Sequence, residues 1–350
     1  MIPQFSPGIK VKRNQGEQLR KALAELGALD RCRKIASDVA YVYLPVLPEL
    51  VEEKRLTEIS DYELVEMEFE PELPITTPES ILGYQPSFEV VGDIAIVEQE
   101  DAGMVAAALM SSCKNLRSVI TPISDVEGEF RTRRFRHVAG EHRTFTVHKE
   151  HGLRYRVDLE GAYFTPRMGT ERLRIAGQVS PGDFVLDMFA GVGPFALLLA
   201  RRGARVVAID KNPVAVKFLK ENAILNKIDL EILEGNASDL ARNYENTADH
   251  VIMNLPHSAN QFLIPAILAA KNGGVVHYYA ISEDDDLYKD LDLIEAAAFQ
   301  LGVKIDALYK GIVRSYAPHR YNVVVDFRVK PSATKEGSQY LLSLQKIGKG

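Results

Sequence analysis

The stretch Asp187–Phe195, with the sequence DMFAGVGPF, decides the fold. It ends an apolar run, DFVLDMF, and opens a helical run that continues as GPFALLLARRG. Gly191 and Gly193 let the backbone approach a ligand without a Cβ clash, and Ala196 stands where a dinucleotide fingerprint has a third glycine or an alanine. A glycine-rich turn between a strand and a helix is typical of a nucleotide-binding α/β sheet.

Four more apolar runs, RVVAID, LEILEG, HVIMNL and GVVHYYAI, follow between residues 205 and 281, most of them separated by helical stretches. This alternation predicts an α/β, Rossmann-like, doubly wound parallel sheet. Asp210 ends the second strand, nineteen residues after Gly191. A carboxylate there can bind both ribose hydroxyls of an adenosine, which suits NAD and S-adenosylmethionine equally. The alternative for Asp210 is a helix N-cap.

The turn after the fourth strand distinguishes between these cofactors. Asn254 is followed by Leu255, Pro256 and His257. An Asn-x-Pro turn at this place is typical of methyltransferases that act on a nitrogen of a planar base, because the amide and the adjacent carbonyl can hold that base beside a methyl donor. The alternative is a plain turn closed by Pro256. Together with the first three strands, the turn favours an S-adenosylmethionine-dependent N-methyltransferase.

Composition restricts the class of protein. The 350 residues carry 42 basic and 48 acidic side chains, a net charge of −6 at pH 7, and the 46% hydrophobic and 26% charged content excludes collagen-like and wholly disordered chains. No apolar run reaches the roughly 18 residues of a membrane-spanning helix, and the first residues lack a signal-peptide core. Two cysteines, Cys32 and Cys113, exclude a disulfide framework, so we expect a cytoplasmic protein.

The net charge hides two opposite segments. Residues 51–101 hold fifteen acidic and two basic side chains, whereas residues 131–156 hold eight Arg or Lys and two Glu. A concentrated basic segment is typical of a phosphate-binding surface. The alternating runs RTFTVH and LRYRVDL predict half-exposed strands there, whose polar faces meet solvent or RNA. An ordinary solvated strand face is the alternative.

The sequence predicts three domains and a C-terminal tail. Residues 1–70 form a small α+β domain with a helix over GEQLRKALAELG and a strand over VAYVYLPVL. We interpret residues 51–86, which are acidic and contain four prolines, as a boundary with some helix and not as part of a central sheet. A basic α+β domain covers 80–158, the catalytic sheet 159–332 and a polar tail 333–350.

Several long motifs in one order resemble archaeal-type tRNA (guanine(37)-N1)-methyltransferases, over residues 1 to about 330. They are VEGEFRTRRFRHVAGEHRTFTVHKEHG (126–152), AYFTPRMGTERLRI (162–175), DMFAGVGPF (187–195), AIDKNP (208–213), IMNLPH (252–257) and VRSYAPHRY (313–321). The resemblance implies a class I methyltransferase domain behind two smaller N-terminal α+β domains, and methyl transfer to N1 of guanosine 37 of tRNA. A related activity on another RNA base, or on wyosine-pathway intermediates at the same position, stays open.

The resemblance also implies roles for the reacting residues. Guanine N1 carries a proton at neutral pH, so the transfer needs a general base and a donor for the charge that develops on O6. Glu171 matches the base, Arg143 the residue that stabilises O6, and Asn254 the residue that positions the base edge. Each of the first two has a structural alternative: an acid is favoured in the first turn of a helix, and Arg143 could touch only phosphate.

Binding residues follow from the same motifs. S-adenosylmethionine, which leaves as S-adenosylhomocysteine, would be bound by Arg172, Tyr163, Phe189, Ala190, Gly191, Val192, Gly193, Asp210, Lys211, Asn212, Asn236, Ala237, Asn254 and Pro256. RNA would be bound by Arg131, Arg133, Arg134, Arg136, Arg143, Lys149, Arg167 and Arg314.

Asn236 departs from the family, which often has Asp there. No residues show metal-ligand spacing, and a role for Mg²⁺ stays open. We expect a monomer that binds the anticodon stem-loop and the elbow of tRNA, and no membrane.

Overall fold

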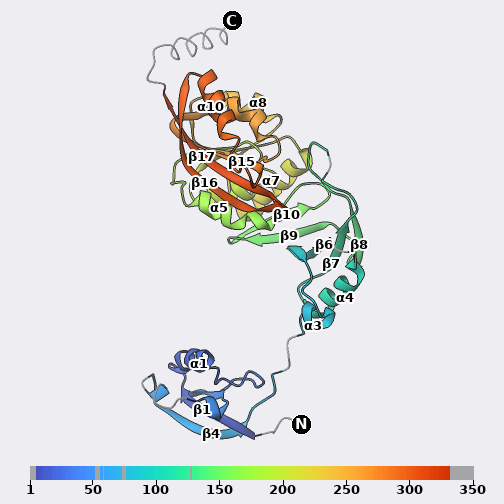
Figure 1. Ribbon diagram of the computed structural model, residues 1–350, viewed down its shortest axis with the longest axis vertical. Helices are drawn as coiled ribbons and strands as arrows, with labels where there is room; N and C mark the ends of the chain where they lie inside the picture. The colour runs from blue at the N-terminus through green and yellow to red at the C-terminus, as the bar shows by residue number, and fades with distance from the viewer. Residues whose placement is uncertain are drawn as a thin grey trace. The chain divides into compact units, whose positions relative to one another are not determined.

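The computed structural model describes residues 5–51, 56–57, 59–72, 76–98, 100–126 and 128–331. The chain divides into two compact units, residues 1–77 and 78–350 (Figure 1). The predicted tail, 333–350, lies outside the described residues. In the part of the chain that is described, no helix is long and apolar enough to cross a membrane.

Among its described residues, the first unit is a four-stranded sheet on which an α-helix packs. Its strands are β1 (Phe5–Lys12), β2 (Ala36–Ser37), β3 (Tyr41–Pro45) and β4 (Tyr62–Glu68), in the order β2-β3-β1-β4, with α1 (Gly16–Glu25) and the 3-10 turn η1 (Pro48–Leu50). The helix buries Leu19 and Leu23 against Ile9 and Leu44, as its apolar spacing predicts.

The strand β4 corrects the interpretation of residues 51–86 as a boundary outside any sheet. It pairs antiparallel with β1 along its whole length. Because β4 is an edge strand, none of its side chains is fully buried and its sequence, YELVEME, carries three glutamates. The apolar alternation that identifies a half-buried strand is therefore weak here.

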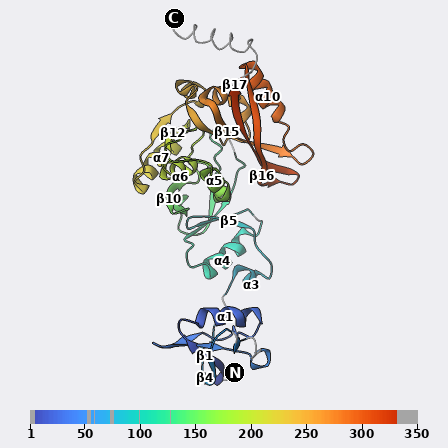
Figure 2. The same cartoon turned by 90° about the vertical axis from the view of Figure 1, so that its left-hand side faces the viewer.

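The second unit begins with a small α+β layer. It contains α3 (Pro78–Leu82), β5 (Phe88–Val91), β6 (Ile94–Val97), α4 (Ala102–Ser112), β7 (Ser118–Pro122) and β8 (Phe135–Gly140), with sheet order β5-β6-β7-β8. The helix α4 packs Val105 and Leu109 against Val97 and Val119. A separate hairpin, β9 (Phe145–Glu150) and β10 (Leu153–Asp158), connects this layer to the large sheet (Figure 2). The strands predicted from the runs RTFTVH and LRYRVDL are present as β9 and β10.

The large sheet has seven strands in the order β13-β12-β11-β14-β15-β17-β16. They are β11 (Phe184–Asp187), β12 (Arg205–Asp210), β13 (Glu231–Glu234), β14 (Ala248–Met253), β15 (Ala270–Glu283), β16 (Val303–Ala317) and β17 (Arg320–Pro331). The first five in sheet order, β13 to β15, are parallel, which confirms the predicted Rossmann-like sheet.

Helices cover both faces of this sheet. One face packs against α5 (Gly169–Ala176), α6 (Pro194–Arg201) and α7 (Pro213–Asn226), and the 3-10 turn η2 (Pro166–Met168) precedes α5. The other face packs against α8 (Ala237–Leu240), η3 (Ala241–Tyr244), η4 (Ala259–Phe262), α9 (Leu263–Ala269) and α10 (Leu291–Gln300). Figure 1 shows α8 and α10 on one side of β15–β17 and α5 on the other.

The strands β16 and β17 add an antiparallel edge that the sequence did not predict. β17 runs antiparallel to β15, and β16 antiparallel to β17. The motif VRSYAPHRY spans the turn between them. The strand order changes direction between β11 and β14, and in open α/β sheets ligands bind at the carboxyl ends of the strands beside such a point.

Candidate active site

The glycine-rich turn connects β11 to α6 at this point of the sheet. Gly193 has φ +93° and is the N-cap of α6, and a Cβ there would lie 2.2 Å from Leu219 Cδ1. Gly191 has φ +56°, and its N–H donates to Asp210 Oδ2 at 2.6 Å. Gly193 is thus required for close packing and Gly191 for its backbone conformation.

A cavity opens above the turn and collects most of the predicted cofactor residues. All of them line it except Val192 and Gly193. Val192 is fully buried, and Gly193 packs against α7. These two residues therefore form the side of the turn that faces away from the cavity, and their assignment as cofactor ligands stays a prediction.

Asp210 closes one end of the cavity. Its carboxylate accepts the backbone N–H groups of Gly191 and Asn212, at 2.6 and 2.8 Å, and burial raises its pKa. The N-cap of α7 is Asn212, whose Oδ1 accepts the Val214 N–H at 2.9 Å. The helix-cap alternative for Asp210 is therefore wrong. Each of its carboxylate oxygens accepts one backbone N–H and keeps a second lone pair that can accept from a ribose hydroxyl.

Asn236 lines the same end of the cavity after β13. Its Oδ1 accepts the N–H of Ser238 at 2.9 Å and so caps α8. An aspartate could make the same bond, because both residues are good N-caps. The departure from the family pattern thus leaves the turn intact, and Asn236 can still present its amide to an adenine.

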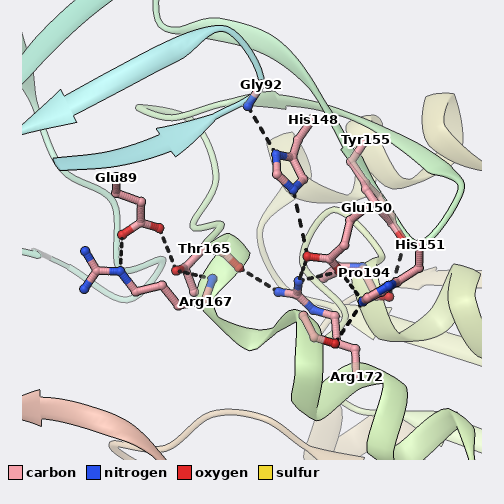
Figure 3. Close-up of polar contacts among 11 residues, drawn as sticks. Glu89, Gly92, His148, Glu150, His151, Tyr155, Thr165, Arg167, Arg172 and Pro194 are labelled. Atoms are coloured by element: carbon pink, nitrogen blue, oxygen red, sulfur yellow. Dashed lines mark hydrogen bonds and ion pairs between the residues drawn. The ribbon is translucent and has the colours of Figure 1, made fainter. Parts of the chain in front are cut away.

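Arg172 on α5 is a buried cation with one unused donor (Figure 3). Its guanidinium donates to both oxygens of Glu150, at 2.8 and 2.7 Å, and to the carbonyl of Thr165 at 2.8 Å. Its Nε has no hydrogen-bond partner among the described residues, although Arg172 lines the cavity. A buried N–H without an acceptor is costly, so the site fits an anionic ligand such as the carboxylate of S-adenosylmethionine.

Figure 3 also shows how Glu150 is held. His148 and His151 approach its carboxylate at 3.9 and 3.8 Å, and the Gly92 N–H donates to His148 Nδ1 at 3.2 Å. Burial raises the pKa of Glu150, but the interactions with His148 and Arg172 outweigh it and hold this pKa below its ordinary value. These two histidines therefore help to hold the Glu150 carboxylate against Arg172.

Replacing Arg172 with glutamine is expected to weaken S-adenosylmethionine binding about tenfold or more, because a charge-assisted hydrogen bond to the cofactor is lost. Isothermal titration with the cofactor alone measures this. Arg201→Gln is the matched control, since Arg201 is exposed and, among the described residues, its one hydrogen bond goes to the Gly152 carbonyl. Equal affinity of wild type and Arg172→Gln would contradict the assignment.

The Asn254–His257 turn lines the opposite end of the cavity. The Ile281 N–H donates to the Pro256 carbonyl at 3.0 Å, which fixes the turn to β15. His257 lies edge-on to Tyr316, with ring centroids 5.2 Å apart. Burial, together with the charges of Arg131 and Arg320, lowers the pKa of His257 to about 4, so this imidazole is neutral at pH 7.

Arg131 lies at this end, although the sequence assigned it only to RNA. It lines the cavity, and its guanidinium lies over the Tyr163 ring at 5.8 Å from the centroid. Arg143, the predicted O6 partner, does not line the cavity. It donates to both oxygens of Asp93, at 3.0 and 2.7 Å, and to Glu141 at 2.7 Å, so it connects the β5–β6 turn to β9. Of these two arginines, Arg131 and not Arg143 lines the cavity.

Glu171 also lies outside the residues that line the cavity. Its carboxylate is buried and accepts two hydrogen bonds from Arg174, at 2.8 and 2.7 Å, and one from the Tyr279 hydroxyl at 2.7 Å. Arg174 in turn donates to Asp326. The predicted base is therefore part of a buried network on the α5 face of the sheet.

A second cavity adjoins the first and gathers half of the predicted RNA-binding residues. Arg131, Arg133, Arg167 and Arg314 line it. Arg134, Arg136 and Lys149 are exposed and line neither cavity. Sequence reasoning missed His257, Tyr316 and Asn322 as lining residues, although His257 follows the Asn-Leu-Pro turn directly and Tyr316 lies within the motif at 313–321.

Comparisons with known proteins show the family of this chain. Three family models match: the tRNA methyltransferase 5 N-terminal domain at residues 8–54, the TYW2 N-terminal domain at 73–144 and the TRM5/TYW2 methyltransferase domain at 146–306. The tRNA (guanine(37)-N(1))-methyltransferase Trm5b of Pyrococcus abyssi is 38% identical, over 92% of this chain and 98% of that protein. The tRNA 4-demethylwyosine(37)-methyltransferase Taw21 of Saccharolobus solfataricus is 36% identical, over 69% and 92%.

Two solved structures extend the comparison. The complex of aTrm5 with tRNALeu has a TM-score of 0.65 and 36% identity, covering 92% of this chain and 99% of that one. Methanocaldococcus jannaschii Trm5 in complex with adenosine has a TM-score of 0.60 and 34% identity, covering 94% and 100%. The sheet order and the cavity define a class I methyltransferase. Within that class, the chain belongs to the archaeal-type Trm5 family.

Proposed function

We propose that this protein transfers a methyl group from S-adenosylmethionine to N1 of guanosine 37 of tRNA. The observation that carries the proposal is one continuous cavity, with the Asp210 carboxylate and the buried Arg172 at its cofactor end and the Asn254–His257 turn at the other. The arginine-lined second cavity opens beside that turn, as a site for an extruded RNA base requires. The named activity of the P. abyssi relative agrees with this reading.

The methyl donor supplies an electrophilic carbon when it is bound. For transfer, the N1–H proton of guanine leaves, negative charge moves onto O6, and the N1–C bond forms as the S–C bond breaks. We assign the positioning of the base edge to the Asn254 amide. We assign the stabilisation of O6 to Arg131, in place of Arg143. The Arg131 guanidinium lines the cavity beside His257 and has no carboxylate partner among the described residues, whereas Arg143 donates to Asp93 and Glu141.

Glu171 stays the proposed proton acceptor. The two carboxylates that line the cavity are used elsewhere: Asp210 accepts two backbone N–H groups, and Glu129 contacts Lys211. Glu171 begins α5 beside Arg172, and Arg174 supplies its counter-charge. The Glu171 carboxylate has to break one of its hydrogen bonds, with Arg174 or with Tyr279, before it can accept a proton from a base in the cavity.

The assignment of Arg131 predicts a clear order between two arginine variants. Arg131→Gln is expected to lower the single-turnover rate by about 10²-fold, a typical loss for one donor to a developing oxyanion. Arg143→Gln is expected to keep most of that rate and to lower the melting temperature instead, because its ion pairs with Asp93 and Glu141 are lost. A larger rate loss for Arg143→Gln than for Arg131→Gln would instead assign the stabilisation of O6 to Arg143.

The remaining basic surface is proposed to bind the rest of the substrate. The exposed Arg134, Arg136 and Lys149 suit backbone contacts with the anticodon stem-loop. The first unit, residues 1–77, is proposed to bind the elbow; its first 50 residues carry eight basic and five acidic side chains. Deleting it is expected to weaken tRNA binding and to leave cofactor binding unchanged.

Methyl transfer to unmodified tRNA transcripts tests the function. With labelled S-adenosylmethionine, the protein is expected to methylate a transcript with guanosine at position 37. It is expected to leave the same transcript with adenosine there unlabelled. Equal labelling of both would contradict the proposal, and labelling only of transcripts that carry 4-demethylwyosine would favour the activity named for the S. solfataricus relative.

A further inference from the structure

The second cavity adjoins the first. The two share six residues, namely Arg131, Tyr163, Phe164, Thr165, Arg314 and Tyr316. A group that enters the first cavity from the RNA chain therefore keeps its connecting atoms in or beside the second. The second cavity carries four arginines and only two acids, Glu89 and Glu98.

Two of the four arginines are already neutralised. Arg133 contacts Glu98, and Arg167 pairs with Glu89 at 2.8 Å, a contact drawn in Figure 3. Arg131 and Arg314 have no carboxylate partner in the described part of the chain. The uncompensated positive charge of this cavity therefore lies at its junction with the first.

The Tyr163 side chain lies between these two arginines. Arg131 lies over its ring, and its charge lowers the pKa of His257, so it belongs to the Asn254–His257 side. Arg314, on β16 opposite Asn322 of β17, donates to the Tyr163 hydroxyl at 3.4 Å. Its Nε is buried and has no hydrogen-bond partner in the described structure.

A guanidinium with a buried, unused N–H is a site for an anion, because leaving the donor unpaired costs more than pairing it. Arginine presents its donors as a planar fork that matches a phosphate. A nucleotide whose base is extruded into the first cavity must carry its two flanking phosphates close behind that base. The anion that reaches Arg314 is then a phosphate of the target nucleotide.

We propose that Arg314 binds a phosphodiester that flanks the target nucleotide, and that the second cavity is the subsite for this phosphate. The inference rests on the proposed function, since it requires an RNA base in the first cavity. It assigns Arg314 a binding role at one linkage, distinct from the general backbone contacts of the exposed basic residues.

Neutral linkages in the substrate test this. A tRNA is assembled by ligation with one methylphosphonate, either between nucleotides 36 and 37 or between 37 and 38, and single-turnover methylation is measured. For the wild-type protein, one of the two linkages is expected to lower the rate about tenfold to a hundredfold. On the tRNA with natural phosphates, Arg314→Gln is expected to lower the methylation rate by a similar factor. On the tRNA with the methylphosphonate, this variant is expected to show no further loss of rate.

Arg205→Gln is the matched control. Arg205 lies at the opposite end of the sheet strands, over the Phe184 ring, and its loss removes the same unit of charge from the protein. With the Arg205→Gln variant, the methylphosphonate is expected to lower the methylation rate by the same factor as with the wild-type protein. Arg314→Lys keeps the charge and replaces Arg314→Gln in this test if the glutamine variant does not fold. With Arg314→Lys, the methylphosphonate is expected to lower the methylation rate, but by a smaller factor than with the wild-type protein.

Three results would overturn the inference. Additive losses from Arg314→Gln and the neutral linkage would show that the two groups act independently. An unchanged rate for Arg314→Gln would show that Arg314 does not contact the phosphate. A parallel loss of S-adenosylmethionine affinity without RNA would assign Arg314 to the cofactor carboxylate. If instead the wild-type protein failed on the all-phosphate transcript, the proposed function itself would fall.

Discussion

Glu171→Gln is expected to lower the single-turnover rate of methyl transfer by about 10²- to 10⁴-fold and to leave S-adenosylmethionine affinity unchanged. Glutamine keeps the size of the side chain but cannot accept the N1 proton. Its amide can still accept from the Tyr279 hydroxyl, so the fold around α5 is preserved. Rapid-quench methylation and cofactor titration measure the two quantities separately.

The control for this change is Glu221→Gln, which removes a carboxylate from a surface pair with Arg156 at 3.3 Å. It is expected to leave the rate within about twofold, because surface pairs contribute little. If Glu171→Gln kept full activity, another group would have to take the proton. His257 is then the next candidate, because it is neutral at pH 7 and lines the cavity beside Asn254.

Asp326→Asn is expected to lower the local free energy of unfolding of the large sheet by about 3 kcal/mol, because it removes one partner from a buried charge network. Asp326 is 1% exposed and accepts hydrogen bonds from Arg174 at 2.6 Å and Gln178 at 3.1 Å. Its other oxygen lies 2.8 Å from His277 Nδ1. Hydrogen exchange of the β15 and β17 amides measures the loss.

This effect depends on pH in a defined direction. Hydrogen bonds from His277 and Arg174 hold the pKa of Asp326 far below its ordinary value of 3.8, against the opposing effect of burial. A depressed carboxyl pKa contributes stability that is complete above the unfolded value and is lost as the pH falls towards the folded one. The difference between wild type and Asp326→Asn should therefore be largest at neutral pH and shrink below about pH 4.

Asp306→Asn is the control for Asp326, since Asp306 pairs with Lys330 at an exposed position. It is expected to change the stability by less than about 1 kcal/mol. An equally small change for Asp326→Asn would mean that the buried network contributes nothing to the sheet. A difference that grew as the pH fell would contradict the sign derived above.

The parts of the site that the sequence predicted well are those that short spacing determines. The turn at Asp187–Phe195, Asp210 and the Asn254–His257 turn each follow a strand directly. Parallel strands bring their carboxyl ends to one edge, so these residues had to meet there. The edge strands β4 and β16 were missed because their polar and charged residues interrupt the apolar alternation.

The choice between arginines depends on contacts that the local sequence does not contain. Arg131 and Arg143 lie in one basic run, and nothing in that run indicates that Asp93, fifty residues earlier, takes up the Arg143 guanidinium. The partners of Glu171 are equally remote: Tyr279 lies 108 residues along the chain. A motif can therefore identify the set of reacting residues while the fold decides which of them faces the cavity.

The central claim is that the methyl group goes to N1 of guanosine 37. Digestion of the methylated transcript with a base-specific nuclease, followed by mass spectrometry of the fragments and nucleosides, locates the product directly. We expect 1-methylguanosine in the fragment that contains position 37 and no other methylated nucleoside. A methyl group on another nitrogen of that guanine, or on a different nucleotide, would contradict it.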